Sequence, residues 1–250
     1  MHYFGNKTAK EITSAGIFLA VIILFVASGI WAFRHFKESP PYVDPEKYPI
    51  RGIDISRHNG EIDFNKVAES GMEFVFIKAS EGKDYRDPQF SKNYDKAKEA
   101  GLKTGAYHFF RFDAEGADQA ENFLKAVSDR PLELGHVIDI EKAGNPEGYD
   151  PEDIKRKLSA MVEYMNLEGH RVMIYTNLEG YYDYIEDILP GTALWICSFR
   201  EHPIYAEWTF WQFDHHGKID GIKEEVDINV FCGNREEWQS FLNGDIWPFS

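Results

Sequence analysis

From Ile50 onward the sequence alternates between short apolar runs and helix-like segments, and this alternation limits the folds that the chain can adopt. Eight runs are predicted to be strands: residues 50–55, 73–79, 103–109, 134–140, 171–176, 193–199, 208–213 and 226–231. The early runs are almost continuously apolar, which is typical of parallel strands covered on both faces. Eight strands with helical crossovers predict an α/β fold in which the sheet closes into a barrel.

The segments between the early strands carry the start and stop signals of helices. Asp87-Pro88 and Asp150-Pro151 each place an acidic cap before a proline at the first helical position. Gly101 and Gly169 stand where carboxyl-terminal glycines are expected. One helix is predicted to bury a stripe of residues at helical spacing: Ile154, Leu158, Met161, Val162 and Met165.

The last three strands depart from this regular pattern. Only residues 200–207 separate the sixth strand from the seventh, and residues 214–225 separate the seventh from the eighth. A parallel crossover needs a dozen or more residues, so these connections are too short or barely sufficient. We therefore expect a modified TIM-like barrel with about five β/α units, followed by three further strands that pair partly antiparallel.

The first part of the chain has a different composition. Residues 12–33 carry no formal charge and are rich in Ile, Leu, Val, Phe and Ala, and as a helix they would span about 30 Å, the thickness of a bilayer core. We expect a retained transmembrane anchor, with cleavage after Ser28 as a signal segment as the alternative. Residues 1–11 would then be a cytoplasmic N-terminus, residues 34–49 a proline-rich extended tether, and residues 50–250 the barrel domain.

Charge and cysteine content narrow the classes of partner. The formal net charge of −15 disfavours nucleic acid as a partner. Cys197 and Cys232 are too few for a disulfide framework, and no Cys/His cluster has the spacing of a zinc site. We expect buried free thiols, with a single bridge as the alternative, and we expect neither a metal nor another cofactor.

Residues 134–141 are an apolar strand that ends in two carboxylates. Side chains alternate along a strand, so Asp139 and Glu141 should point to the same side, about 7 Å apart. Two close carboxylates resist ionising together, and one of them keeps a proton near neutral pH, as the general acid of glycoside hydrolysis must. The Asp-x-Glu pattern alone arises often by chance, so the rest of the chain has to support this interpretation.

In such a barrel the functional face is formed by the carboxyl ends of the strands. Besides the acid pair, the residues expected there are Asp54, Lys78, Tyr107, Tyr175, Trp195, Trp211, Gln212 and Asp227. Aromatic rings beside carboxylates suit a sugar, whose C–H faces stack while its hydroxyls form hydrogen bonds. Alternatively, Asp54 and Asp227 are structural acids of the rim, and the two tryptophans only fill the barrel.

These residues resemble a known family, the glycoside hydrolase family 25 muramidases, which are lysozymes of the Chalaropsis type. The resemblance covers about residues 50–233. It is carried by Gly52-Ile53-Asp54-Ile55-Ser56, Gly60-Glu61-Ile62-Asp63, Ile77-Lys78-Ala79-Ser80-Glu81-Gly82, Asp87-Pro88-Gln89-Phe90, Gly105-Ala106-Tyr107-His108-Phe109, Asp139-Ile140-Glu141, Leu194-Trp195-Ile196, Trp211-Gln212-Phe213 and Val226-Asp227-Ile228-Asn229. Asn59 stands where the family commonly has Gln, and Phe64 stands where it commonly has Trp. These differences concern contacts with the substrate and not the four carboxylates.

The resemblance implies hydrolysis of the β-1,4 bond between N-acetylmuramic acid and N-acetylglucosamine in peptidoglycan. It makes Glu141 the general acid and Asp139 its partner, with Asp54 and Asp227 as supporting carboxylates. We favour Asp139 as the group that orients the substrate acetamido group; a direct nucleophile role for Asp139 or Asp227 stays open.

The resemblance also bears on partners and location. We expect peptidoglycan glycan strands as the partner, a monomer, and a domain held outside the cytoplasm by residues 12–33, in the periplasm or at the cell surface, or secreted if that segment is cleaved. Two other functions remain as alternatives: an inactive membrane-anchored module that binds peptidoglycan, and another N-acetylhexosaminidase such as a chitinase.

Overall fold

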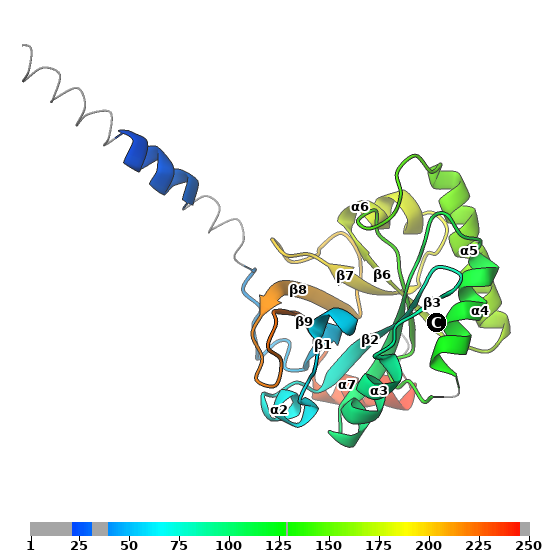
Figure 1. The fold of residues 1–250 in the computed structure, drawn as a ribbon, viewed down its shortest axis with the longest axis horizontal. Coiled ribbons are helices and arrows are strands. Elements are labelled where there is room, and N and C mark those ends of the chain that lie inside the picture. Colours follow the sequence, from blue (N-terminus) through cyan, green and yellow to red (C-terminus); the bar gives the residue numbers. More distant parts are fainter. Residues whose placement is uncertain (1–21, 32–39, 129, 246–250) are drawn as a thin grey trace, which may run out of the picture. The chain divides into compact units, whose positions relative to one another are not determined.

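The computed structural model describes residues 22–31, 40–128 and 130–245, in two units, Met1–Pro40 and Pro41–Ser250. In the first unit, residues 22–31 form a helix (Figure 1). Within the described ranges, no helix is long and apolar enough to cross a membrane. The other residues of the predicted span 12–33 lie outside the described part of the chain.

In the second unit, eight of the described strands close into a barrel (Figure 1). In order around the ring they are β1 (Arg51–Ile55), β2 (Phe74–Glu81), β4 (Lys103–Phe109), β5 (His136–Asp139), β6 (Val172–Asn177), β7 (Ala193–Cys197), β8 (Phe210–Gly217) and β9 (Val226–Phe231). Strand β9 pairs with β1 and completes the ring, and the short strand β3 (Tyr85–Arg86) pairs with the end of β2. Each barrel strand falls on one of the eight predicted runs.

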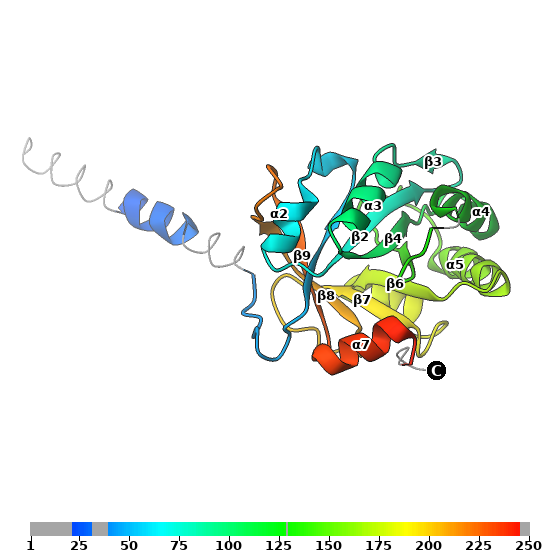
Figure 2. The ribbon, with the colours of Figure 1, turned by 90° about the horizontal axis from the view of Figure 1, so that it is seen from below.

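Helical connections follow the first five barrel strands and lie outside the barrel (Figure 2). They are the short 3-10 turn η1 (Arg57–Asn59) with α2 (Phe64–Glu69), then α3 (Phe90–Glu99), α4 (Gly116–Val127), α5 (Pro151–Leu167), and α6 (Leu178–Gly180), which continues into the π-helical turn η2 (Tyr181–Ile185). The expectation of five β/α units is confirmed.

The capping signals are confirmed in one helix and shifted in another. Asp150 caps α5, since its carboxylate accepts a hydrogen bond from the backbone N–H of Glu152 at 3.0 Å, and the predicted stripe of α5 is buried. Helix α3 begins only at Phe90. The carboxylate of Asp87 instead accepts the backbone N–H groups of Gln89 at 2.8 Å and of Arg57 at 3.0 Å, so it fixes the turn before the helix and does not cap it.

The pairing of the last strands is mixed. Strands β8 and β9 are antiparallel, and so are β9 and β1, as expected. Strands β7 and β8 are parallel, although the connection between them was predicted to be too short. Because β7 ends at Cys197 and β8 begins at Phe210, the connection comprises residues 198–209 and is long enough to cross over without a helix.

The amino-terminal end of the barrel is covered by helix α7 (Arg235–Asn243), which was not predicted from the sequence (Figure 2). Its Trp238 packs against Phe74, with ring centroids 5.7 Å apart, and its Phe241 packs against Phe210 at 5.6 Å. Aromatic burial of this kind is among the largest contributions to a core. Since these rings fill that end of the barrel, a ligand site is left to the carboxyl ends of the strands.

The barrel domain begins before Ile50, contrary to the expected boundary. Val43 and Tyr48, which belong to the predicted tether, are buried. The Tyr48 hydroxyl lies 2.8 Å from Nε2 of His202, and the Tyr48 ring packs against Trp208 with centroids 5.5 Å apart. The part of the tether nearest to the barrel is therefore anchored to the loop between β7 and β8.

Cys197 and Cys232 are free thiols, but Cys232 is exposed, so the expectation that both are buried is wrong.

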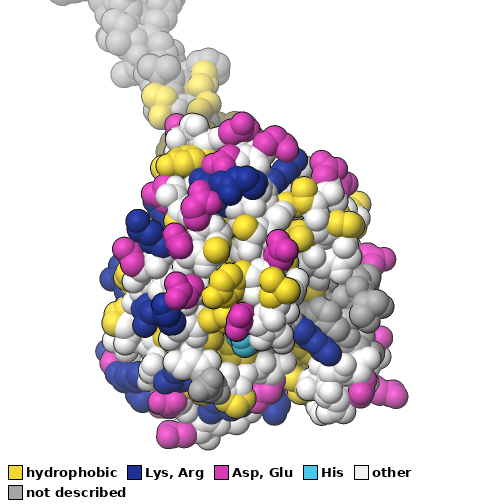
Figure 3. Space-filling model, turned by 90° about the vertical axis from the view of Figure 1, so that its right-hand side faces the viewer, with side chains coloured by type: hydrophobic (Ala, Val, Ile, Leu, Met, Phe, Trp, Pro, Cys, Tyr) yellow, Lys and Arg dark blue, Asp and Glu magenta, His cyan; other side chains and the backbone are white. Residues whose placement is uncertain are grey.

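Acidic and basic side chains are interspersed on the face that carries α4 and α5 (Figure 3). There Arg156 forms ion pairs with Glu115 at 3.1 Å and with Asp153 at 2.8 Å, which joins the start of α4 to α5.

Candidate active site

A cavity of about 220 Å³ lies at the carboxyl ends of the parallel strands. Its lining residues are Asp54, Tyr107, Asp139, Glu141, Tyr175, Trp195, Phe199, Gln212 and Asp227. All four predicted carboxylates and four of the predicted binding residues thus meet in one pocket. The closed barrel is the cause, because it brings the ends of strands that are far apart in the sequence to one mouth.

Asp54 is the centre of a buried hydrogen-bond network. Its Oδ2 accepts the amide N–H groups of Gln212 and of Asn229, both at 2.8 Å. Each amide is itself held in place: the Tyr175 hydroxyl donates to Oε1 of Gln212 at 2.8 Å, and the Trp195 indole N–H donates to Oδ1 of Asn229 at 2.7 Å. Gln212, Tyr175 and Trp195 were predicted to bind substrate; in the structure their hydrogen bonds orient the Asp54 carboxylate.

Asp54 and Asp227 face each other across the antiparallel pair of β1 and β9, and a hydrogen bond joins their side chains. Burial raises the pKa of Asp54 to about 6, against the lowering effect of the two amides. Burial and the Asp54 charge raise the pKa of Asp227 to about 9. Near neutral pH, Asp54 is therefore ionised and Asp227 holds a proton.

The predicted acid pair lies at the end of β5. The strand ends at Asp139, and a short stretch beyond it is held by β6, because Ile140 donates its N–H to the Tyr175 carbonyl at 2.9 Å and accepts the Thr176 hydroxyl at 2.8 Å. Glu141 follows directly and lines the same cavity as Asp139. The expectation that both carboxylates serve one site is consistent with this placement.

The environment of the pair favours protonated carboxyl groups. Burial, followed by the Asp54 charge, raises the pKa of Glu141 to about 7. Burial, followed by the Glu141 charge, raises the pKa of Asp139 well above its usual range. Oδ1 of Asp139 is also buried without a hydrogen-bond partner among the described residues, and unsatisfied buried oxygens of this kind are uncommon.

Lys78 lies beside the cavity and not in its lining. Its ammonium group bonds to Glu81 at 2.9 Å and lies 4.9 Å from the centroid of the Phe109 ring. Its positive charge lowers the pKa of both Asp139 and Glu141, although burial outweighs this effect. Lys78 is thus placed as a counter-ion to the acids, and a substrate contact has no support from this geometry.

Trp211 is placed differently from the prediction. It is buried on the outer face of β8, where its indole N–H donates to the Ser198 carbonyl at 2.9 Å and its ring packs against His202 at 5.0 Å. Side chains alternate along a strand, so Trp211 and its neighbour Gln212 cannot both face the cavity. The structure does not bring Trp211 to the pocket.

Two residues of the site were missed. Asn229 holds Asp54, and its position two residues after Asp227 on the same strand was a signal that both share one face. Phe199 lines the cavity from the loop after β7, where no strand or helix periodicity predicts which way a side chain points. Within the described residues, no group of three His, Cys, Asp or Glu side chains is arranged to hold a metal ion.

A barrel whose mouth holds protonated and ionised carboxylates side by side is equipped for acid-catalysed cleavage of an acetal, which is the chemistry of glycoside hydrolases. Comparison with known proteins agrees with this class. Residues 53–222 match the model of glycosyl hydrolases family 25. The chain belongs to this family and is a glycoside hydrolase.

Individual relatives support the assignment. Lysozyme M1 of Streptomyces globisporus is 34% identical over 212 residues, which cover 78% of this chain and 71% of the relative. The autolytic lysozyme of Clostridium acetobutylicum is 33% identical over 184 residues, which cover 73% of this chain and 56% of the relative. The solved structure of a family 25 glycosyl hydrolase from Bacillus anthracis is 37% identical and superposes with a TM-score of 0.72, covering 81% of this chain and 96% of that one.

Proposed function

We propose that the protein is a lysozyme that hydrolyses the β-1,4 bond between N-acetylmuramic acid and N-acetylglucosamine in peptidoglycan. The observation that carries the proposal is the pair of the buried Asp139 and the half-buried Glu141 in the cavity, with raised pKa values that keep a proton available near neutral pH. The relatives named lysozymes support the choice of peptidoglycan as substrate.

In the proposed mechanism, Glu141 donates its proton to the glycosidic oxygen as the bond from that oxygen to the anomeric carbon breaks. The acetamido carbonyl oxygen of the substrate attacks the anomeric carbon, while Asp139 accepts the acetamido N–H. The unpartnered Oδ1 of Asp139 supports this role, because a substrate donor would satisfy it. Water then opens the cyclic intermediate with Glu141 as the base, which gives net retention.

Asp54 and Asp227 support the reaction in this proposal. The ionised Asp54 adds negative charge near the sugar, where positive charge develops in the transition state. The alternative, in which Asp139 or Asp227 attacks the anomeric carbon directly, also gives retention and differs in its dependence on the acetamido group.

Mass spectrometry of digested peptidoglycan tests the substrate. The proposal expects fragments with muramic acid at the reducing end, and loss of turbidity of a wall suspension that the Glu141→Gln protein does not cause. Fragments with glucosamine at the reducing end, or a preference for chitin oligomers, would instead indicate another N-acetylhexosaminidase.

We further propose that residues 12–33 anchor the protein in a membrane, with the barrel on the extracytoplasmic side as a monomer. The support is the charge-free composition of that segment and the location of peptidoglycan outside the cytoplasm. Protease added to intact spheroplasts should digest the barrel; protection until the membrane is breached contradicts this orientation.

A further inference from the structure

Asn145 lies in the loop that leads from Glu141 to α5, outside the cavity lining. Its side chain makes three hydrogen bonds to backbone groups. Nδ2 donates to the carbonyl of Glu141 at 2.9 Å and to the carbonyl of Phe110 at 2.9 Å, and Oδ1 accepts the N–H of Phe112 at 2.9 Å. Two carbonyls require the NH₂ end and an N–H requires the oxygen, so only an amide satisfies all three partners.

The backbone of Glu141 depends on this contact. Asp139 is the last residue of β5, and the bonds of Ile140 to β6 are the last ladder-like contacts before Glu141. Beyond that point, the carbonyl of Glu141 is held by Asn145, which also closes a turn through its own N–H to the Lys142 carbonyl at 3.0 Å. Asn145 thus ties the residue that carries the proposed general acid to the loop after β4.

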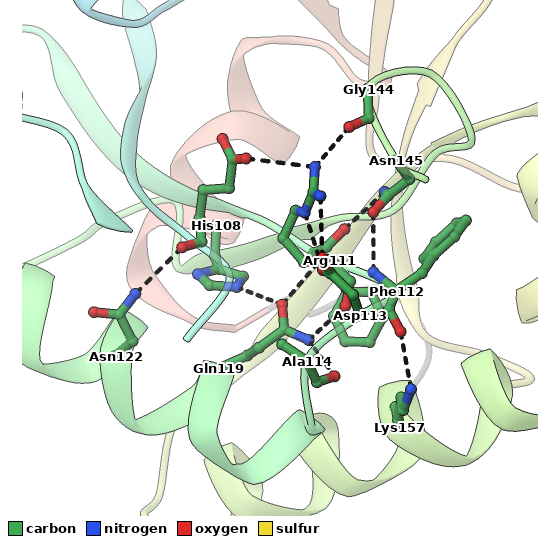
Figure 4. A network of polar contacts seen from close by, with 12 residues as sticks. His108, Arg111, Phe112, Asp113, Ala114, Gln119, Asn122, Gly144, Asn145 and Lys157 are labelled. Carbon is green, nitrogen blue, oxygen red and sulfur yellow. Dashed lines mark hydrogen bonds and ion pairs between the residues drawn. The ribbon is translucent and has the colours of Figure 1, made fainter. Parts of the chain in front are cut away.

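The loop after β4 is braced by a network of hydrogen bonds (Figure 4). Gln119 of α4 accepts the Arg111 N–H at 2.8 Å and donates to the Arg111 carbonyl at 2.9 Å, and its Oε1 lies 3.1 Å from Nε2 of the buried His108. The Arg111 guanidinium donates to the carbonyl of Gly144 at 2.7 Å, which holds the Glu141 loop at a second point.

We propose that Asn145 is a positioning residue for Glu141: its amide fixes the backbone of the acid against the braced loop after β4. This inference rests on the proposed role of Glu141. A general acid has to lie within hydrogen-bond reach of the glycosidic oxygen, and a displacement of about 1 Å can reduce the rate about 10²-fold. Asn145 does not line the cavity, so its effect on substrate binding is small.

The test compares Asn145→Ala and the isosteric Asn145→Asp with Asn234→Ala. Asn234 caps α7 at the opposite end of the barrel and also accepts two backbone N–H groups, at 2.8 and 3.1 Å. Steady-state kinetics on peptidoglycan should show kcat reduced about 10- to 100-fold in both Asn145 variants, with KM within about threefold, and no such loss in Asn234→Ala.

The pH profile provides a second readout that a purely structural role would not move. Burial is the main cause of the raised pKa of Glu141, so a looser backbone that admits water should lower that pKa and move the basic limb of kcat/KM to lower pH. Asn145→Asp keeps the side-chain volume and tests kcat where truncation reduces the folded fraction. Its added negative charge would itself raise the pKa of Glu141, so the pH readout is taken from Asn145→Ala.

The outcomes separate this proposal from the proposed function. The positioning role is wrong, even when Glu141→Gln is inactive, if both Asn145 variants keep the kcat of wild type and Asn145→Ala keeps the basic limb of wild type. The comparison is made with Asn234→Ala as a control for the loss of melting temperature. If Glu141→Gln remains active, the assignment of the acid is wrong, and the inference about Asn145 falls with it.

Discussion

Asp54 and Asp227 lie opposite each other on β1 and β9 and share a hydrogen bond, yet they differ in protonation near neutral pH. The difference has a structural cause. Two amides, from Gln212 and Asn229, donate to one oxygen of Asp54 and favour its charged form, whereas Asp227 faces the resulting negative charge. The pair therefore places one fixed negative charge in the cavity, and this charge acts on Glu141.

Replacing Glu141 by Gln should remove hydrolysis while leaving sugar binding, because the amide has the same shape and no proton to donate. General acid catalysis is typically worth about 10²–10⁴-fold in rate. The measurement is kcat on peptidoglycan, together with equilibrium binding of a glycan fragment. Glu147→Gln makes the same change in an exposed residue of the same loop and should retain activity. More than a tenth of wild-type kcat in Glu141→Gln contradicts the assignment.

Asp139→Asn should lose activity in a way that depends on the substrate. If Asp139 orients the acetamido group, the loss should be about 100-fold or more on N-acetylated substrate and small on a glycoside with a hydroxyl at that position, which reacts without this assistance. The experiment compares kcat/KM for the two substrates in wild type and variant. Equal losses on both would support a direct nucleophile or a structural role.

The pH dependence of kcat/KM should be bell-shaped. Glu141 must be protonated to act, so activity should fall as pH rises through about 7, and it should fall on the acidic side as Asp54 takes up a proton near pH 6. In Asp54→Asn the negative charge that raises the pKa of Glu141 is absent, so the basic limb should move to lower pH. An unchanged or higher basic limb in this variant means that Glu141 is not the titrating acid.

Asp227→Asn should stabilise the protein at neutral and alkaline pH. An aspartate ionises near pH 4 in the unfolded chain, whereas the folded state keeps the proton of Asp227 up to about pH 9. The stability that this proton contributes is complete below about pH 4 and is lost as the pH rises towards 9. Asparagine does not ionise and can still donate to Asp54.

Melting temperatures across the pH range test this prediction. Asp227→Asn should melt at the wild-type temperature near pH 4 and above it at pH 8. The exposed Asp220→Asn provides the control for removing a surface carboxylate and should not reproduce the gain. A variant that melts below wild type at pH 8 contradicts the assigned protonation of Asp227.

Truncations should locate the start of the folded domain. Deletion of residues 1–40 leaves Val43 and Tyr48 in place, so the melting temperature and the activity of the barrel should match those of the full chain. Deletion of residues 1–49 removes both, and burial of Val43 alone is worth about 1.5–3 kcal/mol. The free energy of unfolding in urea is the measurement; equal values for the two truncations would show that the packing of these residues contributes nothing.

Some features of the molecule follow from local sequence. The strand runs, the cap at Asp150, the buried stripe of α5 and the acid pair at the end of β5 depend on near neighbours in the chain, and each was predicted. The five β/α units follow for the same reason, because the connection lengths leave few other arrangements.

Other features depend on residues that are distant in the sequence, and only the tertiary structure decided them. Whether Trp211 or Gln212 faces the cavity is set by strand register, since a shift of one residue exchanges the two faces. The protonation of Asp227 depends on its burial and on Asp54, which lies 173 positions earlier in the sequence. Asn145 holds Glu141 only because the loops after β4 and β5 meet at the mouth of a closed barrel. The type of side chain at each position of the site can thus be read from the sequence. The orientation and the pKa of these side chains come from packing between segments that meet only when the chain folds.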